Sequence, residues 1–474
     1  MNNKKINLTI QKSDIKWSLI AQIINLSVGL VIIPLTLVYL NALEVGLYYL
    51  FQTFSGLALL ADFGFAPTII RNTTTVFSGA TELYPTGINE KNFTQKINIE
   101  LLSNLIKSTK VIYKQITYLV IIFLLIIGSI YILYKTPQEI DRLEVLLSWI
   151  LFACSFVLNA YYSYMTSMIT GAGDIKSPNK INIFNKLLLL ILTYIFLREN
   201  LSLFGVCLAY FISTFITRLI TRKYYLNLFN KIFLKAERIK FKPNLMPVLW
   251  HNASKMGITY IGSFLTLQGT SLVAVSGLDL KIFANFAVSN QILVTLSNLS
   301  NSYMSICSPK IIQMQLEKNN HLLKKFFGSA YFVSLFLYLS SAIFIFFIGN
   351  LILDLIGSEA QLLQNYQLLF LIIIVFMDIN ISICTSYLTT LNIVPHVKST
   401  ITSGVLNIIL SVIFMFYLDL GIWGLLMARF ISQAAYNFWK WPLLVCNKLK
   451  TNPIDFLYIG LNNIVNNIKK PFYF

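Results

Sequence analysis

Residues 201–213 read LSLFGVCLAYFIS, and residues 420–432 read LGIWGLLMARFIS. The two stretches lie 219 residues apart (420 − 201), and six of their 13 positions are identical, including Gly205 and Gly424. Self-similarity at one spacing is the signature of an internal repeat. The sequence therefore predicts a chain built from two related halves.

The composition decides what kind of repeat this is. Of the 474 residues, 56% are hydrophobic and only 12% are charged, and the mean hydropathy is +0.69. A soluble globular chain carries roughly 25% charged residues. The composition therefore predicts an integral membrane protein and excludes a soluble, basic nucleic-acid-binding domain.

Twelve runs are long enough to cross a bilayer, which needs about 20 apolar residues per helix. They lie at 15–40, 45–70, 115–134, 145–170, 178–197, 201–217, 249–276, 282–308, 326–349, 363–390, 399–418 and 421–439. The fold class that follows is an all-α polytopic membrane protein of two six-helix bundles. Because six spans per half leave both copies the same way up, the repeat is parallel, with a pseudo-twofold axis along the membrane normal and a central cavity.

The predicted domains follow from the same reading. They are an N-terminal bundle over 1–226, a basic cytoplasmic linker over 227–248, a C-terminal bundle over 249–449 and a cytoplasmic tail over 450–474. Earlier in each half, an offset of 239 also pairs Gln52 with Gln291. The offset shrinks along the chain because the second half has the shorter loop before its ninth span.

Lysine and arginine fix the expected orientation. With the N-terminus inside, the predicted inner segments hold 30 of the 37 basic residues and the outer loops hold 4. Basic residues gather on the cytoplasmic side of membrane proteins, so both termini are predicted to be cytoplasmic. The net charge of +18 is thus mainly a topology signal, and the inner surface should attract anionic lipid headgroups.

Polar residues mark a possible lining of the cavity. One face of the eighth span carries Gln291, Thr295, Asn298, Ser302 and Ser305, spaced by four, three, four and three residues. The first span has a shorter version in Gln22 and Asn25. Such a stripe avoids hydrocarbon either by lining a wet cavity or by bonding to other helices. Cavity lining is the favoured interpretation.

Ionisable residues within spans are functional candidates by default. They are Lys186, Lys255, Arg429, Asp62 and Asp378, and His251 shares a helix face with Lys255. The three cations either contact substrate in the cavity or extend to the nearer headgroup layer.

The two carboxylates have several alternatives open. Asp62 and Asp378 can each pair with a cation or titrate as an ion-coupling site. For Asp62 a structural role beside Gly64 and Pro67 is equally open.

A cavity with fixed positive charge suits an anion attached to an apolar tail. A diphosphate cannot cross hydrocarbon unaided, and basic side chains with amides and hydroxyls can replace its water. The isolated histidines and cysteines predict no metal site. No cofactor is expected, and a proton or sodium gradient remains open as the energy source.

A family resemblance narrows the substrate. LEVGLYYLFQTFSGLALLADFGFAPTIIR (43–71) resembles the start of bacterial polysaccharide repeat-unit (O-antigen type) flippases, through Gly46-Leu47-Tyr48, Asp62-Phe63-Gly64-Phe65 and Arg71. GAGDIKSPNKINIFNKLLLLIL (171–192) is similar to their fourth-to-fifth-span connection. The family lies in the multidrug/oligosaccharidyl-lipid/polysaccharide exporter (MOP) superfamily.

This resemblance implies two six-helix bundles around a V-shaped cavity in the bacterial inner membrane. It implies a translocase that moves undecaprenyl-diphosphate-linked oligosaccharide to the outer leaflet for surface polysaccharide synthesis, with other polysaccharide-assembly proteins as potential partners. By position type, Lys186, Lys255 and Arg429 are the counterparts of the family's cationic lumen residues. Peptidoglycan-precursor flippases fit less well, because they usually have fourteen spans and 450–474 is too polar for two more.

Two other functions remain open at this stage. One is an ion-coupled multidrug or toxin exporter of the same superfamily. The other is a membrane polymerase or ligase acting on lipid-linked sugars. An enzyme of that kind needs an outer loop with catalytic groups, and the predicted outer loops are short and nearly lack lysine and arginine. The sequence therefore predicts a transporter rather than an enzyme.

Overall fold

The structure is a computed structural model. It describes residues 12–60, 62–84, 97–236, 245–316, 320–391, 395–452, 456 and 458–460. The regular elements of these residues are helices, and the predicted all-helical class is confirmed. Most of the predicted tail and residues 237–244 of the predicted linker lie outside the described part of the chain.

Nine helices within the described residues are long and apolar enough to cross a membrane. They coincide with nine of the twelve predicted spans, which identifies a multi-pass membrane protein. The three other predicted spans are each divided into two helices, α2 and α3, α9 and α10, and α15 and α16. The arrangement of twelve spans around a V-shaped cavity stays a prediction, as do the domain limits.

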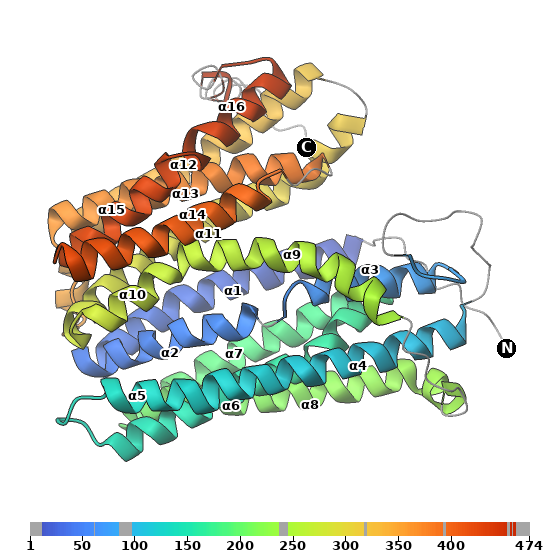
Figure 1. Ribbon diagram of the computed structural model, residues 1–474, viewed down its shortest axis with the longest axis horizontal. Helices are drawn as coiled ribbons and strands as arrows, with labels where there is room; N and C mark the ends of the chain where they lie inside the picture. The colour runs from blue at the N-terminus through green and yellow to red at the C-terminus, as the bar shows by residue number, and fades with distance from the viewer. Residues whose placement is uncertain are drawn as a thin grey trace. The chain divides into compact units, whose positions relative to one another are not determined.

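The chain divides into two compact units, and unit 1 comprises Met1–Leu35 and Leu50–Ile261. The helices that lie wholly or partly in it are α1 (Lys12–Tyr39), α2 (Ala42–Leu60), α3 (Phe65–Phe77), α4 (Ile99–Ile121), the π-helix η2 (Ile122–Gly128), α5 (Ser129–Lys135), α6 (Arg142–Gly171), α7 (Lys176–Arg198), α8 (Ser202–Ala236) and α9 (Met246–Leu267). Within the unit, α6 lies against α3, α4 and α8, and α7 also lies against α8 (Figure 1). The sixth predicted span, 201–217, is thus the first half of a 35-residue helix.

Unit 2 comprises Thr36–Tyr49 and Gly262–Phe474. Its further helices are α10 (Gly269–Gly277), α11 (Leu280–Leu316), α12 (Asn320–Leu355), α13 (Asn365–Thr390), α14 (Val397–Val412), the π-helix η4 (Ile413–Tyr417), α15 (Gly421–Ala434) and α16 (Asn437–Leu449). Here α13 lies against α11, α12, α15 and α16, and α14 lies against α10 and α15. The start of α2 approaches α11 so closely that a Cβ on Gly46 would lie 2.6 Å from the Leu280 carbonyl oxygen.

The prediction of one continuous span over 45–70 is wrong. The helix stops at Leu60 and restarts at Phe65, because Phe63 (φ 46°) and Gly64 (φ 75°) adopt left-handed conformations that a helix cannot contain. The Phe63 ring stacks on Trp250 of α9 with ring centroids 5.5 Å apart.

The prediction for the third span is wrong at its start. The helix begins at Ile99 rather than 115, so part of the predicted inner loop 71–114 is helical, and it continues through η2 to Lys135. A π-helical segment loosens the regular hydrogen bonding of the backbone. Trp149 of α6 compensates, since its indole N–H donates to the Leu124 carbonyl at 3.3 Å and to Ser129 Oγ at 3.2 Å.

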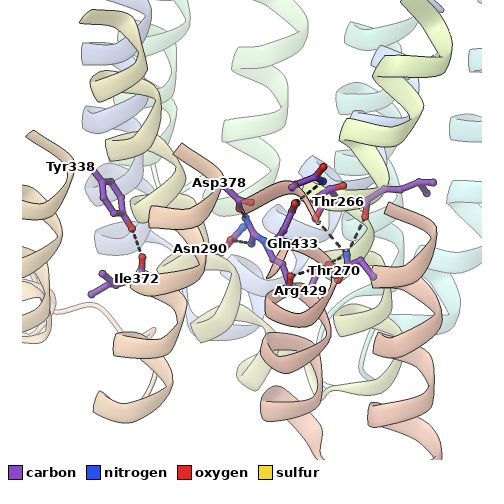
Figure 2. Close-up of polar contacts among 12 residues, drawn as sticks. Thr266, Thr270, Asn290, Tyr338, Ile372, Asp378, Arg429 and Gln433 are labelled. Atoms are coloured by element: carbon purple, nitrogen blue, oxygen red, sulfur yellow. Dashed lines mark hydrogen bonds and ion pairs between the residues drawn. The ribbon is translucent and has the colours of Figure 1, made fainter. Parts of the chain in front are cut away.

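The seventh predicted span is interrupted at Gln268, between α9 and α10. Asn407 of α14 closes this interruption, because its side-chain amide nitrogen donates to the Leu265 carbonyl at 3.2 Å and to Thr270 Oγ1 at 3.0 Å (Figure 2). Interrupted helices expose backbone carbonyls that need other donors. A side chain from a neighbouring helix supplies the donor here.

Candidate functional site

A buried ion pair lies at the centre of unit 2. The Arg429 side chain of α15 is almost completely buried, and its Nη2 lies 2.6 Å from Asp378 Oδ2 of α13. Its Nη1 donates to Asn290 Oδ1 of α11 at 3.0 Å, and Figure 2 shows the guanidinium between these two partners. Three helices are therefore joined by one arginine.

This geometry changes the interpretation of both charged residues. Arg429 does not extend to a headgroup layer, and it is paired with the carboxylate that was a candidate for ion coupling. A buried pair of this kind is locally neutral, and removing one partner leaves an uncompensated charge. Arg429 and Asp378 thus form a structural lock in which neither charge is available alone.

Unit 1 contains an arginine in a comparable place, which the sequence interpretation assigned to an inner loop. Arg218 of α8 donates from Nε and Nη2 to Asn159 Oδ1 of α6, at 2.9 and 2.6 Å, and from Nη1 to Thr166 Oγ1 at 3.2 Å. These acceptors are neutral. Among the described residues no carboxylate forms an ion pair with Arg218.

The repeat explains the acceptor positions but not the arginines, because the offset of 219 pairs Arg218 with Asn437 and Arg429 with Tyr210. Asn159 plus the offset of 219 is Asp378, and α6 lies against α8 as α13 lies against α15. The segments that follow these two residues, SYMTSMIT (163–170) and SICTSYLT (382–389), are identical at four of eight positions at the same offset. Extending the alignment beyond 201–213 would have revealed Asn159 as the counterpart of Asp378.

Asp62 lies at the break between α2 and α3. Tyr113 of α4 donates its hydroxyl to Asp62 Oδ1, and the Ala66 backbone N–H donates to Oδ2 at 3.2 Å. A carboxylate that accepts a backbone N–H in the first turn of a helix stabilises that helix start. The contacts support the structural alternative for Asp62, next to Gly64.

The remaining cationic candidates are not brought together. Lys186 of α7 is partly buried, and no carboxylate pairs with it among the described residues. His251 of α9 is exposed on the helix surface. Lys255 belongs to the same helix, but its side chain lies outside the described part of the structure. Their contact with substrate stays a prediction.

The polar stripe of the eighth span lies on α11. Gln291 and Asn298 are exposed, Ser302 is partly buried and Thr295 is buried. The hydroxyls bond to their own helix, with Thr295 donating to the Gln291 carbonyl at 2.7 Å and Ser302 to the Asn298 carbonyl at 2.8 Å. These bonds do not join α11 to another helix, as the alternative interpretation would require.

The polar residues of the first span are less accessible. Gln22 and Asn25 of α1 are both partly buried. Asn25 Oδ1 is buried and receives no hydrogen bond from any described residue. Their role in lining a cavity stays a prediction. Across the described residues, no group of three or more histidines, cysteines or carboxylates is placed to hold a metal ion.

Solved transporter structures share this fold. A multidrug resistance MATE family transporter of the MOP superfamily in an inward-facing conformation aligns with a TM-score of 0.63 and 13% identity, over 95% of this chain and 96% of its own. The lipid II flippase MurJ, in an inward closed conformation, aligns with a TM-score of 0.58 and 15% identity, over 95% and 94%.

A further structure extends the comparison. A MOP superfamily transporter from Pyrococcus furiosus, in which the reverse polarity of the binding pocket suggests a different function, aligns with a TM-score of 0.55 and 13% identity, over 95% of this chain and 100% of its own. No family model and no curated protein sequence matches the chain. The likeness to MOP superfamily transporters therefore concerns the fold.

Proposed function

We propose that this chain is a polysaccharide repeat-unit translocase, a flippase for undecaprenyl-diphosphate-linked oligosaccharide. It moves the sugar head from the cytoplasmic to the outer leaflet of the bacterial inner membrane by alternating access. The fold shared with a lipid II flippase supports transport of a lipid-linked substrate. The resemblance of 43–71 to O-antigen-type flippases supports the repeat unit as cargo.

The observation that carries this proposal is the state of the charges inside the spans. Asp378 is paired with Arg429, and Asp62 accepts hydrogen bonds from Tyr113 and a backbone N–H. Lys186 has no carboxylate partner within the described residues. The intramembrane carboxylates are therefore engaged, whereas Lys186 is a basic side chain that is not paired with a carboxylate, and this favours an anionic cargo.

The second candidate is an ion-coupled multidrug exporter, and a MATE transporter is among the solved structures of this fold. A hydrophobic organic cation needs an accessible carboxylate or an aromatic cage. The engagement of Asp62 and Asp378 argues against such a cargo. The same two carboxylates also give no support to coupling through a free acid, so the energy source stays open between a proton and a sodium gradient.

In the proposed cycle the sugar–diphosphate head enters a polar cavity while the polyprenyl tail stays in lipid. Lys186 neutralises part of the diphosphate charge, and Lys255 and His251 are further proposed contacts. The exposed amides Gln291 and Asn298 offer hydrogen bonds to sugar hydroxyls. The distribution of lysine and arginine along the sequence supports a cytoplasmic location for both termini.

A genetic assay tests the cargo. In a strain that lacks the native protein, the full chain should restore surface glycan, and Lys186→Ala should restore it at least about tenfold less, because a charge-assisted contact to the diphosphate is lost. Lys398→Ala is the matched control, since Lys398 is exposed at the start of α14. Unchanged surface glycan without the protein, together with new drug sensitivity, would instead support the multidrug exporter.

A further inference from the structure

A cavity of about 370 Å³ lies within unit 1 and is lined by residues of α6, α7 and α8 and of the turn before α7. Nine of its thirteen lining residues have polar side chains. Each of the three helices contributes three of these polar residues. They are Ser163, Thr166 and Thr170 from α6, Asn179, Asn182 and Asn185 from α7, and Thr217, Arg218 and Thr221 from α8. Polar residues of three helices of unit 1 thus line one space.

Arg218 gives this cavity a charge. A guanidinium has five N–H donors, and three are used by Asn159 and Thr166. Two donors and the full positive charge remain. A half-buried charge without a carboxylate partner is costly in a membrane protein, so its retention beside a cavity is best explained by an anion that binds there.

The other lining groups suit an oxyanion with polar substituents. Asn182 and Asn185 line the cavity, and Asn185 Oδ1 is buried and receives no hydrogen bond from a described residue. The amide groups of these two residues can supply neutral donors and acceptors. The cavity also adjoins the start of α7, where Ile175 and Pro178 line it, and the N-terminal end of a helix favours negative charge.

One carboxylate lies near in sequence. Asp174 precedes α7, and its oxygens accept hydrogen bonds from Tyr224 and from Ser177 Oγ at 2.8 Å. It does not line the cavity. Arg218 is therefore the one charged residue among the described residues that line the cavity.

We infer that the cavity between α6, α7 and α8 binds a phosphoryl oxyanion, with Arg218 as its charged partner. The ligand is a phosphate ester or free phosphate, and the volume admits a phosphoryl group with a small polar substituent. The site belongs to unit 1 alone. It does not depend on the proposed translocation of glycans, because it rests on Arg218 and the asparagines of α7.

The test uses the purified full-length chain in a neutral detergent. Calorimetric titration with sodium phosphate, against sodium chloride of equal ionic strength, should show saturable binding. A parallel titration uses dihexanoyl phosphatidylglycerol below its micelle concentration. Tighter binding of the lipid would identify a headgroup as the source, and equal or tighter binding of phosphate would identify the free ion. Both outcomes support the site.

Two variants make the inference falsifiable. Arg218→Gln should weaken binding at least about tenfold, because a charge-assisted hydrogen bond is lost. Asn159→Asp keeps the arginine but supplies an internal carboxylate, as Asp378 does for Arg429, and should weaken binding by a similar factor. Arg222→Gln, one turn further along α8 and exposed, should bind like the unmodified chain.

Saturable binding that neither Arg218→Gln nor Asn159→Asp weakens would overturn the inference, as would the absence of saturable binding for both probes. A glycan translocation assay on the same preparations reports on the proposed function separately. The site can therefore fail while translocation stands, and the reverse also holds.

Discussion

The two halves place an arginine against the same position of the repeat and treat its charge differently. In unit 2, Arg429 faces Asp378 at 2.6 Å and the charge is cancelled. In unit 1, Arg218 faces Asn159, the counterpart of Asp378, at the same distance of 2.6 Å, and the charge is retained. The two sites differ in the group that accepts from the arginine. A carboxylate oxygen neutralises Arg429, whereas an amide oxygen leaves Arg218 positively charged.

The lesson is that a charge inside a span must be judged with its partner. Arg429 is the more deeply buried of the two arginines, yet its pair contributes no net charge. Arg218 follows the predicted end of its span and is the cation that retains its charge. Because Arg218 has no carboxylate partner, desolvation of its charge costs more free energy than desolvation of the paired Arg429. The inferred binding of an anion offsets this cost.

The largest effect is expected when the ion pair of Arg429 and Asp378 in unit 2 is removed. Asp378→Leu should lower the free energy of unfolding by about 3–5 kcal/mol, because it leaves Arg429 charged and buried. Equilibrium unfolding in mixed micelles measures this. The double variant Asp378→Leu/Arg429→Met should recover a large part of the loss. A double variant as unstable as the single one would show that the pair contributes packing rather than charge compensation.

The next effect tests the close approach of helices within unit 2. Gly46→Val should lower the free energy of unfolding by about 1–3 kcal/mol, because even a Cβ would lie 2.6 Å from the backbone oxygen of Leu280. Gly29→Ala is the matched control, since no atom lies within 4 Å of a Cβ at that helical position. It should be neutral or slightly stabilising. Equal stability of the two variants in the same unfolding assay would contradict the close contact.

A smaller effect is expected when unit 1 receives a carboxylate at the position equivalent to Asp378. Asn159→Asp should raise the free energy of unfolding by about 1 kcal/mol, because the hydrogen bonds of Arg218 become charge-assisted on both sides. The unfolding midpoint in the same micelles reports the change. A lower midpoint would mean that desolvation of the new carboxylate exceeds its attraction to Arg218.

The smallest effect concerns the protonation of His396, which directly precedes α14. His396 and Ser177 occupy equivalent positions at the offset of 219 (396 − 219 = 177). Burial lowers the pKa of His396 from its usual 6.5, and its Nδ1 is buried with no hydrogen bond to a described residue. The neutral ring is therefore favoured in the folded state.

The sign of the pH dependence follows. The contribution of His396 is fully present above about pH 6.5, where the ring is neutral in both folded and unfolded chains, and it is lost as the pH falls below that value. Acidification should therefore lower stability through this residue. His396→Ser should reduce the pH dependence of the unfolding midpoint below pH 6.5, and an unchanged profile would exclude His396 as its source.

The sequence predicted the apolar runs but not the interruptions within them. Residues 45–70 are mostly apolar, and hydropathy cannot detect a break that depends on the positive φ angles of Phe63 and Gly64. The stacking of Phe63 on Trp250 is a tertiary contact, about 190 residues away in sequence (250 − 63), which no local pattern reports.

The charged residues show a similar limit. The pairing of Asp378 with a cation was one open alternative, and the sequence could not select it. Arg218 was missed because a basic residue at the end of an apolar run is typical of an inner loop, whereas α8 continues as helix to Ala236. The correspondence of Asn159 with Asp378 was present in the sequence, and it acquires meaning only when each is seen beside its arginine.

The most direct test of the central claim is a reconstituted translocation assay. The purified chain is placed in proteoliposomes with an undecaprenyl-diphosphate-linked oligosaccharide, and the fraction of sugar heads reached by a membrane-impermeant glycosidase is followed with time. We predict that the chain increases this fraction and that Lys186→Ala slows the increase at least about tenfold. Sugar heads that stay as protected as in protein-free liposomes, while the same vesicles export a hydrophobic organic cation, would contradict the account.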